Sequence, residues 1–346
     1  MRRYETWRLA DTHRRAVAAL PPHPGPALDE ATRRQALEFV GSLVRGYRDL
    51  RWHEAYARTG RPSPFYLPDD IYFALVLPAL NPADRTAILA DRNHLDRIEG
   101  FPPLPATVGR LVKGRLLDAH FRPATTTELT RQLPRDARLV VKPSRGSGAL
   151  VLVEVSALAG ALDGRTDAII QLPVTQHRDL TVLNVSTLNT LRVITWRRLD
   201  GEVLHLGTCL RIGRGGPRID AAGTGHVYCG IDSERGLLLA DGCSNDGTRV
   251  YQAHPDSGLL FAERKVPGAT AARDAYVAAH RQLPWIDLAA WDIAIDTTGH
   301  SVTLDLDFAP AIGVPQLALG PIFAPVADDL RQRIGVRRHS RLLGFV

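Results

Sequence analysis

The sequence predicts an α+β protein in which a helical N-terminal region precedes a strand-rich body. Two observations support this prediction. Apolar side chains recur at helical spacing through about the first eighty residues. The second half instead holds short β-branched runs separated by glycine-rich connections. With 346 residues, 45% of them hydrophobic, the chain can bury a sizeable core and hold two or three subdomains.

The N-terminal region reads as helices with proline-rich breaks. A helix is predicted over Leu28–Leu50, with Asp29 as its N-cap. Pro21–Pro26 separates it from an earlier arginine-rich helix, and Gly60–Pro68 precedes another short apolar helix. Since no pattern here indicates chemistry, we interpret the region as a helical cap or docking element.

The strand-rich body begins after a mixed stretch, in which a helix containing Lys113 is predicted over Leu111–Ala119. Arg138–Lys142 then predicts a strand that returns, after a Gly/Ser loop, as Ala149–Val155, so that the two form a hairpin. Further strands are predicted over Ala168–Leu172, Leu191–Arg198, Val203–Ile212, Trp291–Ile295 and Ser301–Phe308.

The net charge of +6 comes almost entirely from arginine. Of 43 basic residues only Lys113, Lys142 and Lys265 are lysines, which leaves 43 − 3 = 40 arginines. No aromatic-interleaved basic strip accompanies them, so we do not expect a nucleic-acid partner. Because an ammonium and a guanidinium are not interchangeable at phosphates, a lysine in so arginine-rich a chain can mark a site that needs a compact cation.

Other classes of site are disfavoured. Cys209, Cys229 and Cys243 form no CxxC pair, so we expect neither a disulfide framework nor a zinc site. The apolar runs are too short to span a bilayer, and the stretch after Met1 is charged, unlike a signal peptide. We therefore expect a cytoplasmic protein without membrane contact.

A first candidate for anion binding lies at the end of the Arg138–Lys142 strand. The strand delivers Lys142 out of the sheet, and Ser144, Gly146, Ser147 and Gly148 follow it. Small residues let backbone N–H groups approach an anion closely, which is the physics of a phosphate cradle. Because the lysine precedes the glycines, the segment is not a Walker A loop. An ordinary hairpin turn is the alternative interpretation.

A second candidate is a trio of aspartates near the C-terminus. Asp292 lies in an otherwise apolar strand, and Asp305 and Asp307 project from one face of another. Acids packed together need a cation, or one of them takes a proton. Carboxylate and phosphate oxygens are the ligands that Mg²⁺ prefers, so the trio predicts a magnesium site. A buried Asp–Arg network is the alternative.

Two strand arginines, Arg192 and Arg211, lie between these candidates, and paired guanidinium donors suit phosphate oxygens. Taken together, the motifs resemble the ATP-grasp superfamily, and most closely its sugar-transfer-associated branch, related to α-L-glutamate ligases. The similarity covers roughly Lys113 to Pro315. It rests on T-L-R-V-I-T at Thr190–Thr195, H-P-D-S-G at His254–Gly258 and W-D-I-A at Trp291–Ala294.

The resemblance implies an ATP-grasp fold, with two α+β subdomains gripping ATP, and roles for single residues. Lys113 and Lys142 would contact phosphates, and the Ser144–Ala149 loop would close over them. Gln171, Leu172 and Val174 would contact adenine and Asp179 the ribose. Asp292, Asp305 and Asp307 would hold Mg²⁺, where D-x-D replaces the family's usual E-x-N. Arg192 and Arg211 would be catalytic, facing the γ-phosphate or an acyl phosphate.

The same resemblance implies an ADP-forming ligase that joins small-molecule carboxylates to amines or hydroxyls through an acyl phosphate. Kinase-like phosphoryl transfer, or an ATP-binding accessory protein of a glycan pathway, are alternatives. The substrates and the oligomeric state stay open. We expect a helical N-terminal region at residues 1–83, a central α/β subdomain at 84–136, a lid at 137–185 and a C-terminal subdomain with the metal site at 186–346.

Overall fold

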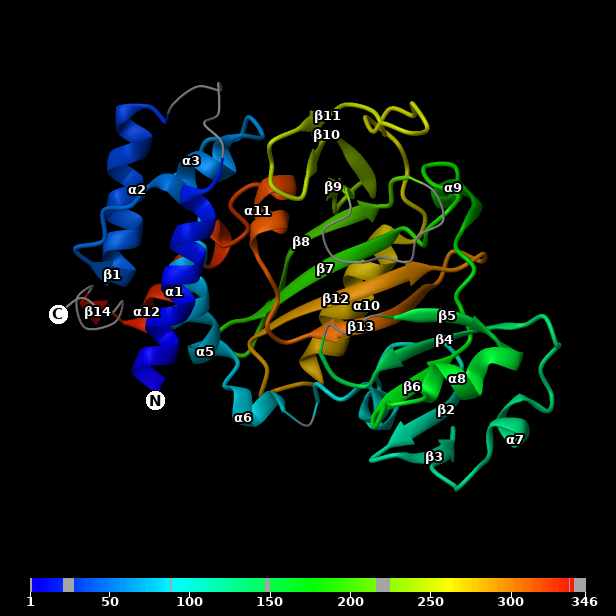
Figure 1. Cartoon of the computed structure of the whole chain (residues 1–346). Coiled ribbons are helices and arrows are strands. Elements are labelled where there is room, and N and C mark those ends of the chain that lie inside the picture. The colour runs from blue at the N-terminus through cyan, green and yellow to red at the C-terminus, as the bar shows by residue number, and fades with distance from the viewer. Residues whose placement is uncertain are drawn as a thin grey trace.

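The computed structural model describes residues 2–20, 28–87, 89–146, 150–215, 225–335 and 337–338. It confirms the predicted α+β fold, with helices gathered beside one large and one small antiparallel sheet (Figure 1). Within these ranges no helix has both the length and the apolar character needed to cross a bilayer.

The N-terminal region consists of helices, as predicted. Asp29 caps one of them, because its side chain accepts a hydrogen bond from the Thr32 N–H at 2.6 Å. That helix ends at Leu43, earlier than predicted, and the chain continues as a two-residue strand that pairs with β14 near the C-terminus. The elements are α1 (Arg2–Ala18), α2 (Glu30–Leu43), β1 (Val44–Arg45), α3 (Arg51–Ala57), α4 (Asp69–Ile71), a π-helix (Tyr72–Val76), α5 (Leu77–Leu80), α6 (Ala83–Thr86) and a 3₁₀ segment (Arg92–Arg97).

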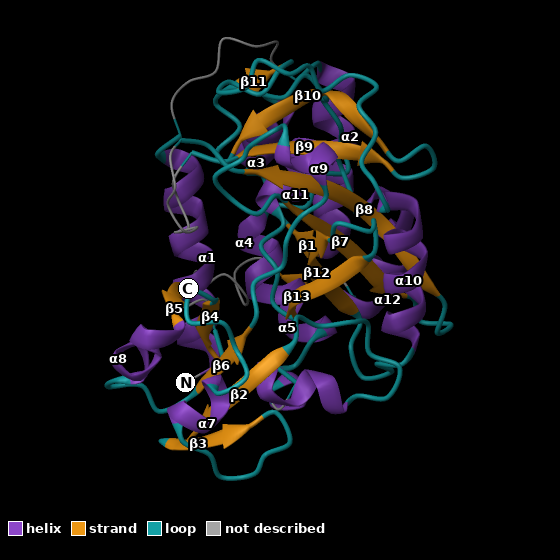
Figure 2. Ribbon diagram, turned by 90° about the vertical axis from the view of Figure 1, so that its right-hand side faces the viewer, coloured by secondary structure: helices purple, strands orange, loops and turns teal. Residues whose placement is uncertain are grey.

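The large sheet has seven antiparallel strands in the order β11-β10-β9-β8-β7-β12-β13. Alternate side chains point to its two faces. Leu191 and Val193 pack with α10 on one face, whereas Ile194 and Trp196 pack with the N-terminal helices on the other. Figure 2 shows α10 beside β7 and β8. The strands are β7 (Thr190–Arg197), β8 (Val203–Ile212), β9 (Val227–Asp232), β10 (Leu237–Ser244), β11 (Val250–Tyr251), β12 (Leu288–Ile295) and β13 (Ser301–Asp307); the helices are α10 (Ala269–Arg281), α11 (Gly313–Leu319) and α12 (Ala327–Ile334), followed by β14 (Arg337–Arg338).

The small sheet has five antiparallel strands in the order β3-β2-β6-β4-β5. The predicted hairpin around Lys142 is confirmed as β4 and β5. The expected subdomains 84–136 and 137–185 both contribute strands to this sheet, so the boundary at residue 136 divides it. The strands are β2 (Thr107–Val112), β3 (Arg115–Asp118), β4 (Arg138–Pro143), β5 (Val151–Glu154) and β6 (Ala168–Gln171); the helices are α7 (Thr126–Thr130), α8 (Leu158–Leu162) and, beyond the sheet, α9 (Arg178–Thr181).

The helix predicted over Leu111–Ala119 is wrong, because this stretch forms the β2–β3 hairpin. Lys113 and Gly114 make its two-residue turn, both with positive φ (50° and 74°). Such a turn follows the right-handed twist of the two strands, and the glycine adopts it without steric cost. Helical periodicity and a short hairpin are hard to separate over nine residues.

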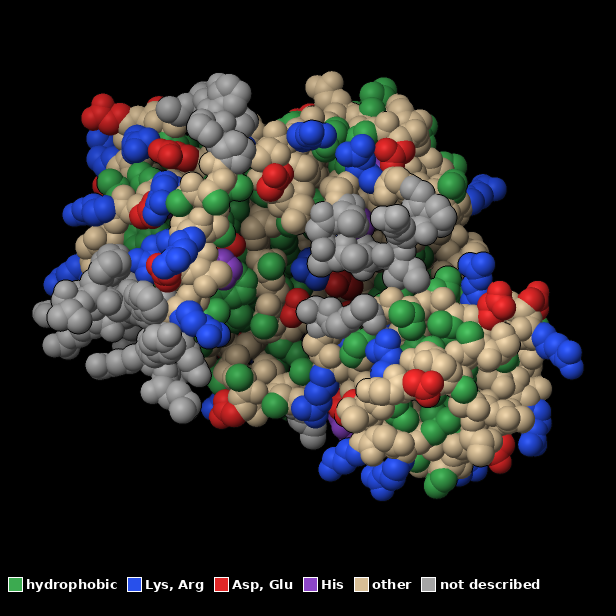
Figure 3. All heavy atoms as spheres, in the orientation of Figure 1, with side chains coloured by type: hydrophobic (Ala, Val, Ile, Leu, Met, Phe, Trp, Pro, Cys, Tyr) green, Lys and Arg blue, Asp and Glu red, His purple; other side chains and the backbone are tan. Residues whose placement is uncertain are grey.

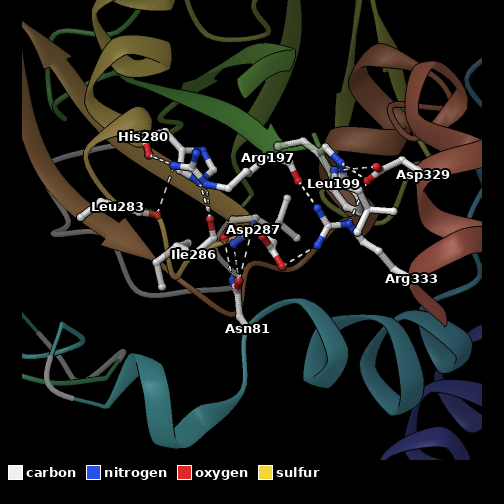
Figure 4. Close-up of polar contacts among 11 residues, drawn as sticks. Asn81, Arg197, Leu199, His280, Leu283, Ile286, Asp287, Asp329 and Arg333 are labelled. Carbon is white, nitrogen blue, oxygen red and sulfur yellow. Dashed lines mark hydrogen bonds and ion pairs between the residues drawn. The ribbon is translucent and has the colours of Figure 1, made fainter. Parts of the chain in front are cut away.

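A buried amide ties the N-terminal helices to the large sheet (Figure 4). Asn81 Nδ2 donates to the carbonyl oxygens of Leu288 (2.6 Å) and Phe308 (2.7 Å). Its Oδ1 accepts from the N–H groups of Asp287 (3.0 Å) and Leu288 (3.3 Å). Nearby, Arg333 of α12 pairs with Asp287 at 2.6 Å. These contacts fix the chain where it leaves β13, one residue beyond Asp307.

Candidate functional site

Lys142 reaches across from the small sheet to the large one. Leu139 and Val141 pack beneath α8, so the alternating pattern of β4 turns Val140 and Lys142 to the opposite face. There Lys142 Nζ donates to the carbonyl oxygen of Leu304 in β13 at 2.8 Å. Burial lowers the pKa of Lys142 to about 8, although the nearby charge of Asp305 opposes the shift.

The three predicted aspartates lie on one face of two neighbouring strands. Asp292 of β12 stands opposite Asp305 of β13 in the pairing register, and Asp307 follows two residues later. Leu306 and Phe308 point the other way, into the core beneath α10. Strand alternation therefore gathers the three carboxylates on the face that the N-terminal helices and α11 cover in part.

Two arginines hold two of these carboxylates. Arg192 of β7 donates from Nε and Nη2 to the two oxygens of Asp292, each at 2.8 Å. This bidentate pair, and above all the charge of Asp292, raises the pKa of Arg192. Arg92 binds both oxygens of Asp305 in the same way, with Nε at 2.9 Å from Oδ1. The Asp–Arg network that was the alternative to a metal site is therefore present.

Arg92 was missed at the sequence level. Its Nη1 donates to the carbonyl oxygens of Pro143 and Gly146, each at 3.0 Å, and its N–H donates to the carbonyl oxygen of Ser144 at 2.8 Å. One guanidinium thus joins the loop after Lys142 to the acidic strand. The chain has 40 arginines, and Arg92 begins a short 3₁₀ segment, so no local sequence pattern distinguished it from the others.

Asp307 differs from the other two acids. Its Oδ1 accepts from the Ala309 N–H at 2.9 Å, and among the described residues no arginine or lysine forms an ion pair with it. Burial raises its pKa, and the charges of Asp292 and Asp305 add to the shift against the opposing effect of Arg192. A cation beside Asp307 would relieve this excess of negative charge.

The oxygen-only donor set of Asp292, Asp305 and Asp307 fits Mg²⁺ in chemistry. As the side chains stand, however, no three metal-ligating groups of the described chain are arranged to hold an ion. Arginines instead bind the carboxylates of Asp292 and Asp305. A metal ion at Asp305 would have to share the carboxylate with Arg92 or displace it.

A cavity of about 620 Å³ opens beside Lys142, between the two sheets. Val140, Lys142 and Leu152 line it from the small sheet, and Thr190 and Leu304 line it from the large one. The predicted adenine contacts line it as well, namely Gln171, Leu172 and Val174. A pocket of this size with mostly apolar walls and a few polar groups suits a small-molecule ligand.

The remaining predicted residues fall at different distances from this centre. Ser144 is fully buried beside Lys142, and its Oγ has no partner in the part of the chain that is described. Gly146 contributes its carbonyl to Arg92. Ser147 and Gly148 lie outside the described residues. Arg211 stands opposite Thr190 on β8, on the face that carries Arg192.

Two predicted nucleotide contacts are not brought to the centre. Lys113 lies in the exposed β2–β3 turn, where its N–H donates to Asp167, and it takes no part in the contacts around Lys142. Asp179 is exposed on α9, where it lies near His177 and Arg178, and it is not among the residues that line the cavity. Figure 3 shows one face of the molecule, which is hollowed between the N-terminal helices and the strands, with acidic and basic side chains at the floor of the hollow.

Residues 149–332, more than half of the chain, match the family described as sugar-transfer associated ATP-grasp. No curated protein sequence matches the chain. Three solved structures resemble it: the ATP-grasp ligase PsnB with a minimal precursor (13% identity, 73% of this chain and 63% of that one, TM-score 0.43), an L-amino acid ligase from Bacillus licheniformis (13%, 71% and 48%, 0.42), and N5-carboxyaminoimidazole ribonucleotide synthetase from Thermotoga maritima (11%, 65% and 43%, 0.37).

The chain thus spans less than two thirds of the length of these structures, and the similarity to them is weak. The family match has a firmer basis, because it includes the T-L-R-V-I-T, H-P-D-S-G and W-D-I-A motifs and all three aspartates. The chain belongs to the sugar-transfer associated ATP-grasp family.

Proposed function

We propose that this protein is an ATP- and Mg²⁺-dependent ligase that joins a carboxylate to an amine or hydroxyl and releases ADP. The observation that carries the proposal is the meeting of opposite charges at the junction of the two sheets. Lys142 and Arg92 approach from the side of the small sheet, Asp305 and Asp307 from the large one, and a cavity opens beside them. Membership of an ATP-grasp family supports the same function.

We propose one orientation of the nucleotide in the cavity. The base would occupy the cavity against Val140, Leu172 and Val174, whose apolar side chains suit an aromatic ring. The triphosphate would then extend toward Lys142, which lines the cavity, and toward Arg92, which binds the loop after Lys142. Ser144 would supply a hydroxyl that has no other described partner.

The aspartates would hold Mg²⁺, with Asp307 as the ligand already free of an arginine and Asp305 as the second. Bound there, the ion would neutralise charge on the transferring phosphoryl group. Arg92, on leaving Asp305, would remain beside the loop and could turn its donors to phosphate oxygens. The ion pair between Arg92 and Asp305 therefore occupies the place of Mg·ATP in the absence of ligand.

The chemistry would proceed in two displacements. A carboxylate oxygen attacks the γ-phosphorus in line, the bond to the β-phosphate oxygen breaks, and ADP leaves with the bonding pair. The acceptor's lone pair then attacks the acyl carbon, the carbon–oxygen bond to phosphate breaks, and the phosphate leaves and takes the acceptor's proton. Lys142, Arg192 and Arg211 would stabilise the charge on the phosphoryl oxygens.

The test is to incubate the protein with Mg·ATP and a panel of carboxylates and amines, while ADP, AMP and phosphate are measured. ADP release that requires both a carboxylate and an acceptor supports the ligase. ADP release with one stable phosphorylated product indicates a kinase, and tight ATP binding without turnover indicates a binding protein. Release of AMP would contradict the acyl-phosphate chemistry outright.

A further inference from the structure

Strand β13 sets the order of the subsites. Leu304 lines the cavity, Asp305 and Asp307 carry the acids, and the carbonyl oxygen of Pro310 accepts a hydrogen bond from Tyr72 at 2.7 Å. At about 3.3 Å per residue, Leu304 and Asp307 are separated by roughly 10 Å along the strand. The strand and the segment after it thus run from the proposed base pocket, past the acids, to the N-terminal helices.

In-line transfer uses this direction. The attacking and leaving groups lie on opposite sides of the transferring phosphorus. If the base lies at the Leu304 end, the carboxylate must approach the phosphorus from the end where Tyr72 meets Pro310, and the acceptor then meets the acyl group that forms there. The pKa of Tyr72 is raised, first by burial and then by the charges of Asp307 and Asp69, so Asp69 is electrostatically close to this end of the site.

Asp69 is a carboxylate with unusual surroundings. It is 8% exposed, the hydroxyl of Tyr56 donates to it, and His13 Nδ1 lies 3.9 Å from its Oδ2. Gly313, which begins α11, is so near that a Cβ added there would lie 3.6 Å from Oδ2. Across the described ranges, no lysine or arginine forms an ion pair with Asp69.

His13 leaves hydrogen-bonding capacity beside this carboxylate. Its ring stacks on Phe73 with centroids 4.2 Å apart, and neither ring nitrogen makes a hydrogen bond within the described chain. Burial lowers the pKa of His13 and so favours the neutral ring, in which one nitrogen can accept a hydrogen bond. Burial also raises the pKa of Asp69 to about 7, although the hydrogen bond from Tyr56 opposes the shift.

The neighbouring Asp70 shows what a purely structural acid looks like here. It is 0% exposed, and the hydroxyl of Tyr47 lies 2.9 and 3.1 Å from its two oxygens. Asp69 and Asp70 therefore share burial and a tyrosine partner. Only Asp69 borders the segment after β13 and an imidazole without a hydrogen bond.

We propose that Asp69 and His13 bind the primary ammonium group of the acceptor substrate, so that the acceptor is an amine and not a hydroxyl compound. The inference rests on the proposed function and narrows it. An ammonium has three donors and a positive charge. It supplies a positive counter-charge to the Asp69 carboxylate, and it can donate a hydrogen bond to a ring nitrogen of His13. The ammonium must pass one proton to the Asp69 carboxylate, after which the lone pair of its nitrogen can attack the acyl carbon from the side opposite the base.

Histidine NMR on the whole chain tests this subsite without knowledge of the natural substrate. The protein carries ¹³Cε1-labelled histidine, and the signal of His13 is the one that disappears in His13→Gln. n-Butylammonium chloride is titrated at about pH 8, where Asp69 is mostly ionised, against 1-butanol in sodium chloride of equal ionic strength. We expect a saturable shift of the His13 signal with butylammonium alone. No shift, or an equal shift with 1-butanol, overturns the proposal.

Two matched variants locate the effect. Asp69→Asn keeps the shape and an acceptor for Tyr56 but removes the charge, and we expect it to weaken butylammonium binding at least tenfold. Asp70→Asn removes the adjacent buried charge and should change binding less than twofold. The proposal is overturned if Asp69→Asn binds butylammonium like the wild type, or if Asp70→Asn weakens binding equally. The wild-type titration decides the matter even if neither aspartate variant folds.

Calorimetry with Mg·ATP on the same samples separates this inference from the proposed function. We expect Asp69→Asn to bind Mg·ATP within twofold of the wild type, because Asp69 contacts none of the proposed nucleotide ligands. Failure of the wild type to bind Mg·ATP would contradict the proposed function, whereas loss of butylammonium selectivity with Mg·ATP binding intact contradicts only the amine subsite.

Discussion

Replacing Lys142 by methionine should make the protein more stable and less able to bind nucleotide. Lys142 is half-buried, and its ammonium group donates to one backbone carbonyl, that of Leu304. Methionine has a similar length and no charge, so it fills the same space without the desolvation cost. Function and stability therefore make opposite demands on this side chain.

The size of the effect follows from the pKa. Burial lowers it from 10.5 to about 8, and each unit corresponds to about 1.4 kcal/mol, so the charged form costs about 3 kcal/mol at neutral pH. Loss of the hydrogen bond to Leu304 returns about 1 kcal/mol. The net gain of about 2 kcal/mol, divided by an unfolding entropy of about 2.1 cal/mol/K per residue, corresponds to about 3 °C for a chain of this length.

The pH dependence has a defined sign. Below pH 8 both the folded and the unfolded chain hold the Lys142 proton, and the cost is fully present. Between pH 8 and 10.5 the folded protein releases the proton while the unfolded chain keeps it, so the wild type gains stability as the pH rises. The advantage of the methionine variant should therefore be largest near pH 7 and shrink toward pH 10.

Urea unfolding of the nucleotide-free protein in EDTA, at several pH values, measures this difference. Calorimetry with Mg·ATP should show at least tenfold weaker binding by the variant. Lys265→Met, at an exposed lysine, is the control and should alter neither quantity. A Lys142→Met protein that is no more stable than the wild type at pH 7, or whose advantage does not depend on pH, would refute the reasoning.

Three further predictions concern other parts of the chain. Asp305→Asn should weaken Mg·ATP binding or turnover at least tenfold, about 1.4 kcal/mol, and an unchanged variant in calorimetry or in the ADP-release assay would count against the acidic site. Asn81→Ala should lower the free energy of unfolding by roughly 2–5 kcal/mol, because it leaves buried backbone groups without partners. The exposed Asn245→Ala is its control in urea unfolding, with a change expected below about 0.5 kcal/mol. The pKa of His280 is lowered to about 4 by burial, so the unfolded chain takes up the proton from pH 6.5 downward before the folded one does. Stability present above pH 6.5 should therefore fall toward pH 4, and His280→Gln should flatten this decline, as unfolding curves across that range would show.

The strands around the site were predictable because they combine strong local signals. Residues 191–196 and 288–295 are mostly apolar and include β-branched and aromatic side chains, and the one charged residue of each stretch, Arg192 or Asp292, stands out against that background. The facing of Asp305 and Asp307 follows from strand alternation alone. The motifs add their order along the chain, which is why the family could be identified from residues before any geometry was available.

The contacts between the sheets were not predictable from a local pattern. Arg92 and Asp305 are 213 positions apart, and nothing near Arg92 in the chain indicates a partner. The scarcity of lysine was an incomplete guide for the same reason. It singled out Lys142, which reaches from one sheet to the other, but it also singled out Lys113, which lies in an exposed turn, and it gave no weight to an arginine.

The two interpretations of the aspartates, a metal site and an Asp–Arg network, are compatible if the arginines balance the carboxylates in the ligand-free protein and a metal ion balances them when ligand is bound. Without ligand, carboxylates that are partly buried favour cations beside them, and Arg192 and Arg92 supply these at Asp292 and Asp305. Arg192 and Asp292 face each other on paired strands within the large sheet, so their contact can persist. Arg92 belongs to another part of the fold and also holds the loop after Lys142, so its contact with Asp305 is the one that we propose Mg²⁺ replaces.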